Sequence, residues 1–334
     1  MYELLGISLV LAALLTVNAL ASFASAGLWR FLKSPLQSCS ANVRAEFLFA
    51  FRVAPLLFST LFVTAFLIPA YLLHEPYSTN EVVGGKLALL ATVSTIGVLL
   101  AVSRGVRSWL ATRRLLRVWL RAARPAKLPN VVIPTFVMTN EFPILAVVGT
   151  FRPRLFVAEQ VLSTLTPEEL RAAIAHEAGH LNARDNLKRS LLRACRDTLL
   201  MIPCGRSIDR AWAETSESAA DEFAAQESPA AAINLASALV KVARMIPAGA
   251  RAAVPVATFL VGNEGDRGIR ARVTRLLELA SVKRSAQRTF VRYRLLLPMM
   301  LIAVPFAAIV LHHSNSEVLA SIHSLIEHTV QLLS

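Results

Sequence analysis

The chain has 334 residues, of which 55% are hydrophobic and only 17% are charged, against about 25% in an ordinary soluble domain. Its mean hydropathy of +0.53 excludes intrinsic disorder and argues against an ordinary soluble protein. Lys and Arg outnumber Asp and Glu by 35 to 22, giving a net charge of +13, which is typical of nucleic-acid binders and of membrane proteins with basic loops.

Four apolar stretches are long enough to cross a bilayer, which takes about 20 residues. Three come early in the chain and one comes late, at residues 4–29, 53–73, 82–103 and 295–311. A cleaved signal peptide is the alternative for the first, since Ala24-Ser25-Ala26 is similar to a cleavage site. However, no Lys or Arg precedes its apolar run, which is also long for a signal peptide. We therefore predict about four transmembrane helices.

The distribution of Lys and Arg predicts how these helices are oriented, because cytoplasmic loops retain basic residues. Basic residues occur at 30–46, 104–127 and 283–294, and they are absent from 1–3, 74–81 and 312–334. Every loop fits an arrangement in a bacterial-type inner (plasma) membrane with both termini outside and the large central domain in the cytoplasm. The three cysteines, Cys39, Cys195 and Cys204, then lie on the reducing side, which favours free thiols.

The predicted organisation has four parts: a membrane region at 1–103, a cytoplasmic domain at 104–294, a fourth span at 295–312 and an amphipathic tail at 313–334. The Trp- and Arg-rich stretch 104–127 directly follows a span, which favours an amphipathic helix on the inner leaflet over a nucleic-acid surface. No nucleic-acid partner is expected.

The fold class is α+β, with a small β-sheet in a mainly helical domain. Short strands are predicted at 131–133, 136–138, 144–148 and 155–157, and helices in the rest of the domain. The chain is thus expected to be a multi-pass membrane protein that carries this domain.

A helix with metal-binding chemistry is predicted after Thr166. Thr166-Pro167-Glu168-Glu169 has the N-cap, the proline and the glutamate of a capping box. The helix then carries His176-Glu177-Ala178-Gly179-His180, an HExxH motif. Four residues advance a helix by about one turn, so both imidazoles lie on one face and can bind one ion, typically zinc. Glu177 is then placed to act on a water molecule.

A catalytic zinc needs a third protein ligand, and no other histidine lies in the predicted cytoplasmic domain. The predicted helix 207–226 carries the acidic candidates. Glu217 and Asp221 share a face, so one can bind the ion while the other hydrogen-bonds a ligand histidine. Glu214 is a competing ligand one turn earlier. Asp185, five residues after His180, is a further candidate for structuring the site, whereas Cys195 and Cys204 are interpreted as core thiols.

These motifs resemble those of a known group. The sequence from His176 to His180, followed by Asp185 and by Glu217-Ser-Ala-Ala-Asp221, is similar to the HExxH…ExxxD pattern of integral-membrane zinc metallopeptidases, which include HtpX, the CAAX prenyl endopeptidases and the BlaR/MecR type. Three spans before the motif resemble the BlaR/MecR type in particular. The resemblance implies His176, His180 and Glu217 as ligands of one Zn²⁺, Glu177 as catalytic base and Asp221 as a partner of a ligand.

Arg272 resembles the arginine of a late family motif, but the His-Pro pair that precedes it in HtpX-like members is missing here, which leaves its role open. A large extracytoplasmic sensor is missing as well. We therefore expect regulation through a separate regulatory or sensor protein, or through the membrane itself.

The expected activity is zinc-dependent endopeptidase hydrolysis of cytoplasmic or membrane-associated proteins, as in regulated proteolysis by repressor cleavage. Two alternatives stay open: an HtpX-like quality-control protease, and a non-enzymatic signalling or scaffold protein that has kept the fold. A substrate peptide would pair with an exposed strand edge. The candidate edge comprises Leu145, Ala146, Val147 and Val148.

Overall fold

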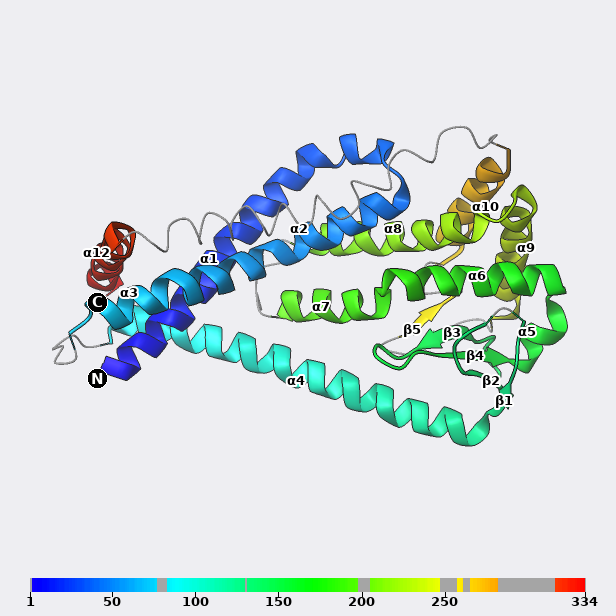
Figure 1. The fold of residues 1–334 in the computed structure, drawn as a ribbon, viewed down its shortest axis with the longest axis horizontal. Coiled ribbons are helices and arrows are strands. Elements are labelled where there is room, and N and C mark those ends of the chain that lie inside the picture. Colours follow the sequence, from blue (N-terminus) through cyan, green and yellow to red (C-terminus); the bar gives the residue numbers. More distant parts are fainter. Residues whose placement is uncertain are drawn as a thin grey trace.

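The computed structural model describes residues 2–76, 83–129, 131–197, 205–246, 257–260, 265–281 and 316–333. These residues are mostly helical and form an elongated molecule (Figure 1). The first turn of the chain and the last described helix lie at one end, and a small sheet lies towards the other.

The described residues up to Ala122 form mainly long apolar helices. Their elements are α1 (Tyr2–Leu32), the 3-10 turn η1 (Pro35–Ser38), α2 (Ala41–Phe62), the π-helical turn η2 (Val63–Leu67), α3 (Ile68–His74) and α4 (Gly85–Ala122). Three helical segments, 2–32, 41–74 and 85–122, are long and apolar enough to cross a membrane. They match the first three predicted spans. The fourth, at 295–311, lies outside the described residues.

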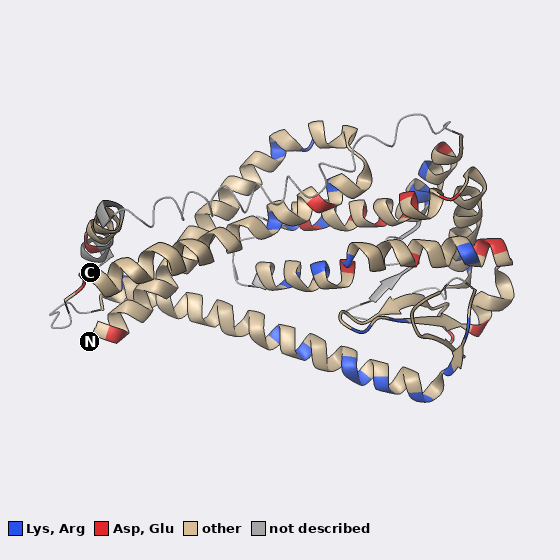
Figure 2. Cartoon of the chain, viewed as in Figure 1, with Lys and Arg blue, Asp and Glu red and all other residues tan. Residues whose placement is uncertain are grey.

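The Trp- and Arg-rich stretch after the third span continues the same helix. α4 runs from Gly85 to Ala122, about 57 Å, and its last turns carry basic side chains (Figure 2). Trp119 is buried and packs edge-on against Phe156, with 5.1 Å between the ring centroids. The expectation of a separate amphipathic helix with Trp119 on its lipid-facing side is therefore wrong, because the stretch continues α4 and Trp119 packs into a protein core.

The sheet contains β1 (Arg124–Ala126), β2 (Thr135–Met138), β3 (Leu145–Val148), β4 (Arg154–Ala158) and β5 (Ala257–Phe259), in the order β1-β2-β4-β3-β5. β2 and β4 are parallel, and the other pairs are antiparallel. The predicted strands at 136–138, 144–148 and 155–157 are confirmed. The one at 131–133 is wrong, because Pro129 and Pro134 bracket it and Val132 is fully exposed.

The remaining helices are α5 (Glu159–Thr164), α6 (Pro167–Ala183), α7 (Asp185–Asp197), α8 (Arg206–Ala225), α9 (Pro229–Met245), α10 (Gly265–Ser281) and α12 (Ser316–Leu333). α6 packs against α8, α9 and β3, and the main core includes buried residues of β3, β4, α6 and α9. α12 is the helix predicted in the tail, and its Leu319 packs with Leu67 of η2 and Ala70 of α3.

Helix α8 packs against the N-terminal apolar helices. Its Trp212 and Ile208 belong to one apolar cluster with Leu48 and Phe51 of α2. A largely buried ion pair, Arg52 Nε to Asp209 Oδ1 at 2.9 Å, links the same two helices. The helix that carries the acidic candidates is therefore held directly against α2, one of the three candidate spans.

Candidate active site

The helix that carries the histidines begins at its predicted cap. Thr166 Oγ1 accepts a hydrogen bond from the Glu169 amide at 3.3 Å, and Glu169 Oε2 accepts one from the Thr166 amide at 2.8 Å, which completes the capping box. Glu169 also accepts hydrogen bonds from Ser237 Oγ (2.6 Å) and Lys241 Nζ (2.8 Å) of α9. Burial opposes ionisation, but the Lys241 and Ser237 hydrogen bonds hold the pKa of Glu169 below its usual value. The start of α6 is thus fixed to α9.

A close approach of two helices brings the acidic residues to the histidines. A Cβ atom on Gly179 would lie 3.1 Å from Ala220 Cα and 3.2 Å from Phe223 Cβ, so a larger residue would push α6 and α8 apart. The glycine within the HExxH motif therefore has a packing reason: it allows Glu217 to lie opposite both histidines.

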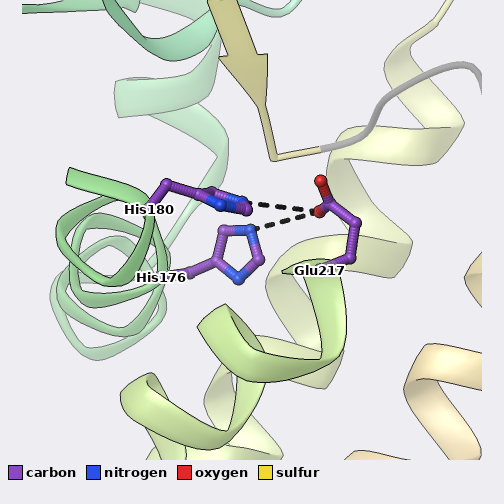
Figure 3. Close-up of side chains that lie close together, drawn as sticks. All are labelled: His176, His180 and Glu217. Atoms are coloured by element: carbon purple, nitrogen blue, oxygen red, sulfur yellow. Dashed lines mark ion pairs between the residues drawn. The ribbon is translucent and has the colours of Figure 1, made fainter. Parts of the chain in front are cut away.

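His176, His180 and Glu217 form a group of three possible metal ligands, whose ligand atoms all lie within 4.8 Å of one another (Figure 3). Nε2 of each histidine lies 3.6 Å from Glu217 Oε2, and the two imidazole planes are perpendicular. The ligand atoms of a tetrahedral zinc are about 3.4 Å apart, given bonds of about 2.1 Å. His180 Nε2 and Glu217 Oε2 are buried and have no hydrogen-bond partner among the described residues. The donor set, its spacing and these orphaned atoms fit a zinc ion.

Two aspartates orient the imidazole rings. Asp221 Oδ1 lies 2.9 Å from His176 Nδ1, and Asp185 Oδ2 lies 2.7 Å from His180 Nδ1, so each ring directs Nε2 towards Glu217. Ser216 Oγ donates to the same oxygen of Asp185 at 2.7 Å. Such carboxylate partners fix the ring orientation and increase the basicity of a ligand histidine.

The electrostatics of the group favour positive charge between the two rings. Burial works against protonation, but the carboxylates of Glu217 and Asp185 raise the pKa of His180 to about 10. Burial likewise opposes ionisation of Glu217, but the charge of His180, the proximity of His176 and the charge of Arg272 keep its pKa well below the usual value. Arg189 Nη2 also lies 3.0 Å from Glu217 Oε1. A cation at the centre would supply the charge that these carboxylates favour.

Arg272 reaches the group from α10. Its Nε and Nη2 donate to the two oxygens of Asp221 at 2.9 and 2.7 Å, and its Nη1 lies 3.4 Å from Glu217 Oε2. Although burial opposes ionisation, the charge of Arg272 lowers the pKa of Asp221 to about 2. Nη1 also donates to the carbonyl of Leu260. The arginine whose role the sequence left open therefore holds Asp221 against His176.

Glu177, the predicted base, is buried beside the histidines. Its Oε2 accepts a hydrogen bond from the Val147 amide of β3 at 3.1 Å. Burial raises its pKa above that of an ordinary glutamate. This carboxylate therefore has a raised affinity for a proton, in a fixed position between the sheet and α6.

The strand predicted as an exposed edge lies inside the sheet. β3 pairs with β4 on one side and with β5 on the other, and Leu145, Ala146, Val147 and Val148 are all buried. The expectation of an edge is wrong because β5, more than 100 residues later in the chain, covers it. Contact of these residues with a substrate stays a prediction.

Several residues of the site were not predicted. Ser216, Arg189 and Asn186 each contact a site residue or β3, and Asn186 Nδ2 donates to the carbonyls of Val147 and Gly149, both at 3.2 Å. Arg189 lies one helical turn after Asp185, a spacing that could have indicated a shared face. Glu214 is exposed and outside the ligand group, while Cys195 is buried with a pKa that burial raises to about 11.

Residues 110–244 match the model of Peptidase family M48, a stretch from the end of α4 to α9 that contains both histidines, Glu217 and Asp221. No curated protein sequence matches the chain. Family M48 is zinc-dependent. The match supports a place for this chain in the HExxH zinc metallopeptidase superfamily and indicates a metallopeptidase, which is a hydrolase.

Proposed function

We propose that this protein is an integral-membrane zinc endopeptidase that hydrolyses cytoplasmic or membrane-associated proteins. One observation carries this proposal: the side chains of His176, His180 and Glu217 converge on one point. Glu177 lies between the two histidines on α6. These three residues would hold one Zn²⁺, with Asp185 and Asp221 orienting the two histidines.

Zinc bound at this site would polarise the scissile carbonyl. It would also lower the pKa of a water molecule, so that the water loses a proton and attacks the carbonyl at neutral pH. Glu177 takes the proton of the attacking water at its carboxylate and delivers it to the leaving amine. Burial of the carboxylate raises its pKa, so Glu177 is a stronger base than an exposed glutamate. The Val147 amide holds the carboxylate in place between the two proton transfers. A purely structural zinc site has no need of such a base, which favours an enzyme over a scaffold protein.

The membrane location is supported by the three long apolar helices and by their contacts with α8. The basic residues at the sheet end of α4 favour a cytoplasmic domain with the N-terminus outside (Figure 2). The fourth span, at 295–311, stays a prediction from the sequence because it lies outside the described residues. A reporter fused after Ser334 should then be active only outside the cell, and cytoplasmic activity would refute this orientation.

Among membrane peptidases, we favour a BlaR/MecR-type role in regulated proteolysis over an HtpX-like quality-control role. Three candidate spans precede α6 here, whereas HtpX-like enzymes place two before the motif. The substrate would be a protein such as a repressor, and a separate regulatory protein would supply the signal.

The test is a cleavage assay of the purified full chain with casein and with candidate repressors. Glu177→Gln should retain zinc, because Glu177 lies outside the ligand group, but should lose turnover. Glu168→Gln, the same change at an exposed position of the same helix, should behave like the wild type. Equal cleavage by wild type and Glu177→Gln would refute the proposed mechanism, and zinc binding without any cleavage would favour the scaffold alternative.

A further inference from the structure

A cavity of about 330 Å³ lies directly beside His180. Its walls come from the β3–β4 turn, the last turn of α6 and the start of α7, and it is lined by apolar and neutral side chains together with His180 and one cation, Arg184. A cavity of this size next to a candidate metal ligand is large enough for a substrate side chain.

The backbone at Arg184 is in a conformation that an arginine rarely adopts. Its φ of 55° and ψ of 38° are left-handed, and it is the one residue other than glycine with a positive φ in the described part of the chain. The turn is needed, because α6 must stop there for Asp185 to reach His180 Nδ1. Glycine meets this requirement without strain and is the usual residue at such a helix end. The chain nevertheless carries a long cationic side chain at this position, which favours a role for that side chain.

Arg184 brings a positive charge to the cavity. Arg184 is exposed, no acidic residue lines the cavity, and none of the described carboxylates forms an ion pair with it. The opposite wall is fixed, since Asn186 donates to the carbonyls of Val147 and Gly149 and so ties the β3–β4 turn to α7. A cavity with partly apolar walls and one guanidinium that no described carboxylate pairs with is complementary to a side chain with methylene groups and a carboxylate.

We propose that this cavity is a substrate subsite that accepts an acidic side chain next to the scissile bond and pairs its carboxylate with Arg184. The inference rests on the proposed peptidase function, because the position of the cavity relative to the scissile bond follows from His180 as a metal ligand. The apolar walls, which include Leu181 and Leu187, would contact the methylene groups of a glutamate.

The test uses the purified full chain and matched peptides that carry Glu, Gln or Lys at each position around the cleavage site. At one such position, the wild type should cleave the Glu peptide with a kcat/KM about tenfold above that of the Lys peptide, and Arg184→Glu should reverse this order. Arg184→Gly should lose the preference while melting no lower than the wild type, since glycine relieves the backbone strain. Arg171→Glu, the same charge change at an exposed position of α6, should keep the wild-type order.

A binding measurement separates this proposal from the peptidase function itself. The anisotropy of a fluorescent Glu peptide should show binding to Glu177→Gln and a loss of binding when Arg184→Glu is added. Cleavage with unchanged Glu-over-Lys preference in Arg184→Glu would overturn the subsite and leave the peptidase function intact. The opposite result, Arg184-dependent binding without cleavage by the wild type, would support an acidic-peptide site and overturn the peptidase function. An equal loss of activity towards Glu and Lys peptides in Arg184→Glu would also overturn the subsite.

Discussion

The two sides of the site differ in how their polar groups are used. On the helical side, formed by α6, α8, α10 and the face of α7 that carries Asp185 and Arg189, the acidic groups have partners: Asp185, Asp221 and Glu217 face histidines, arginines or a serine. On the strand side, formed by the β3–β4 turn and the start of α7, Arg184 has no carboxylate partner among the described residues, and Asn186 Oδ1 is buried without a hydrogen-bond partner there. On the helical side the charged groups are already paired before any ligand binds. On the strand side the positive charge of Arg184 is available to pair with a substrate.

The largest effect should follow from removing a ligand on the helical side. Glu217→Ala should lower zinc affinity by well over 100-fold and abolish activity, because changes to residues that merely orient ligands already cost about 10–100-fold. Glu214→Ala, three residues earlier on the same helix but exposed, should retain full zinc. Elemental analysis of both variants is the measurement. Full zinc in Glu217→Ala together with a metal-free Glu214→Ala would move the third ligand to Glu214.

A smaller loss of zinc affinity should follow when all three ligands are kept and one residue that orients a ligand histidine is changed. Asp221→Asn removes the negative charge between His176 and Arg272 while keeping the side-chain shape, so zinc affinity should fall by about 10–100-fold. Competition with a chelator measures this. Glu222→Gln changes the neighbouring carboxylate, which contacts α2 and α10 instead of a histidine, and should keep wild-type affinity. Equal affinities in the two variants would show that the organisation around His176 does not support the metal.

The helical side also depends on the capped start of α6. A change there should lower the stability of the fold and leave the zinc affinity unchanged. Glu169→Gln should cost about 1–3 kcal/mol at pH 7, because three hydrogen bonds lose a charged acceptor. The folded-state pKa of Glu169 lies below the ordinary value of 4.5, so its contribution is present above that pH and is lost as the pH falls through the folded-state pKa. Melting curves against pH should therefore converge for wild type and variant in acid. A difference in melting temperature between wild type and Glu169→Gln that stays constant in acid would show that the charge of Glu169 does not stabilise the fold.

The smallest effect is expected on the strand side. Asn186→Ala removes both donors to the β3–β4 turn, so the cavity wall should loosen and KM should rise about threefold to tenfold, the equivalent of one net hydrogen bond. Zinc content should not change. Asn182→Ala, at an exposed position of α6, is the control for steady-state kinetics. A loss of zinc in Asn186→Ala would show that the two sides are not independent.

Local patterns predicted the metal-binding helix well, because its cap and its ligand spacing lie within a few residues. The capping box at Thr166 and the facing of His176 and His180 depend on helix geometry alone. Distant parts of the chain were harder to predict. β5 covers β3 from more than 100 residues away, and Arg272 reaches Asp221 from α10, so neither contact has a local signal. The error at Trp119 has a similar origin, since an amphipathic helix beside a span can meet lipid or protein equally well.

The unbroken helix α4 connects the predicted third span directly to the sheet. One end lies in the predicted third span, and the other carries Trp119 into the core that contains Phe156. Because the helix is about 57 Å long, a tilt of about 10° at the membrane end displaces the far end by about 10 Å if the helix stays rigid. Helices of fixed apolar length change their tilt when the thickness of the bilayer changes. In the proposed membrane orientation, a change in lipid composition would therefore be transmitted through α4 to the sheet, whose strand β3 contacts Glu177.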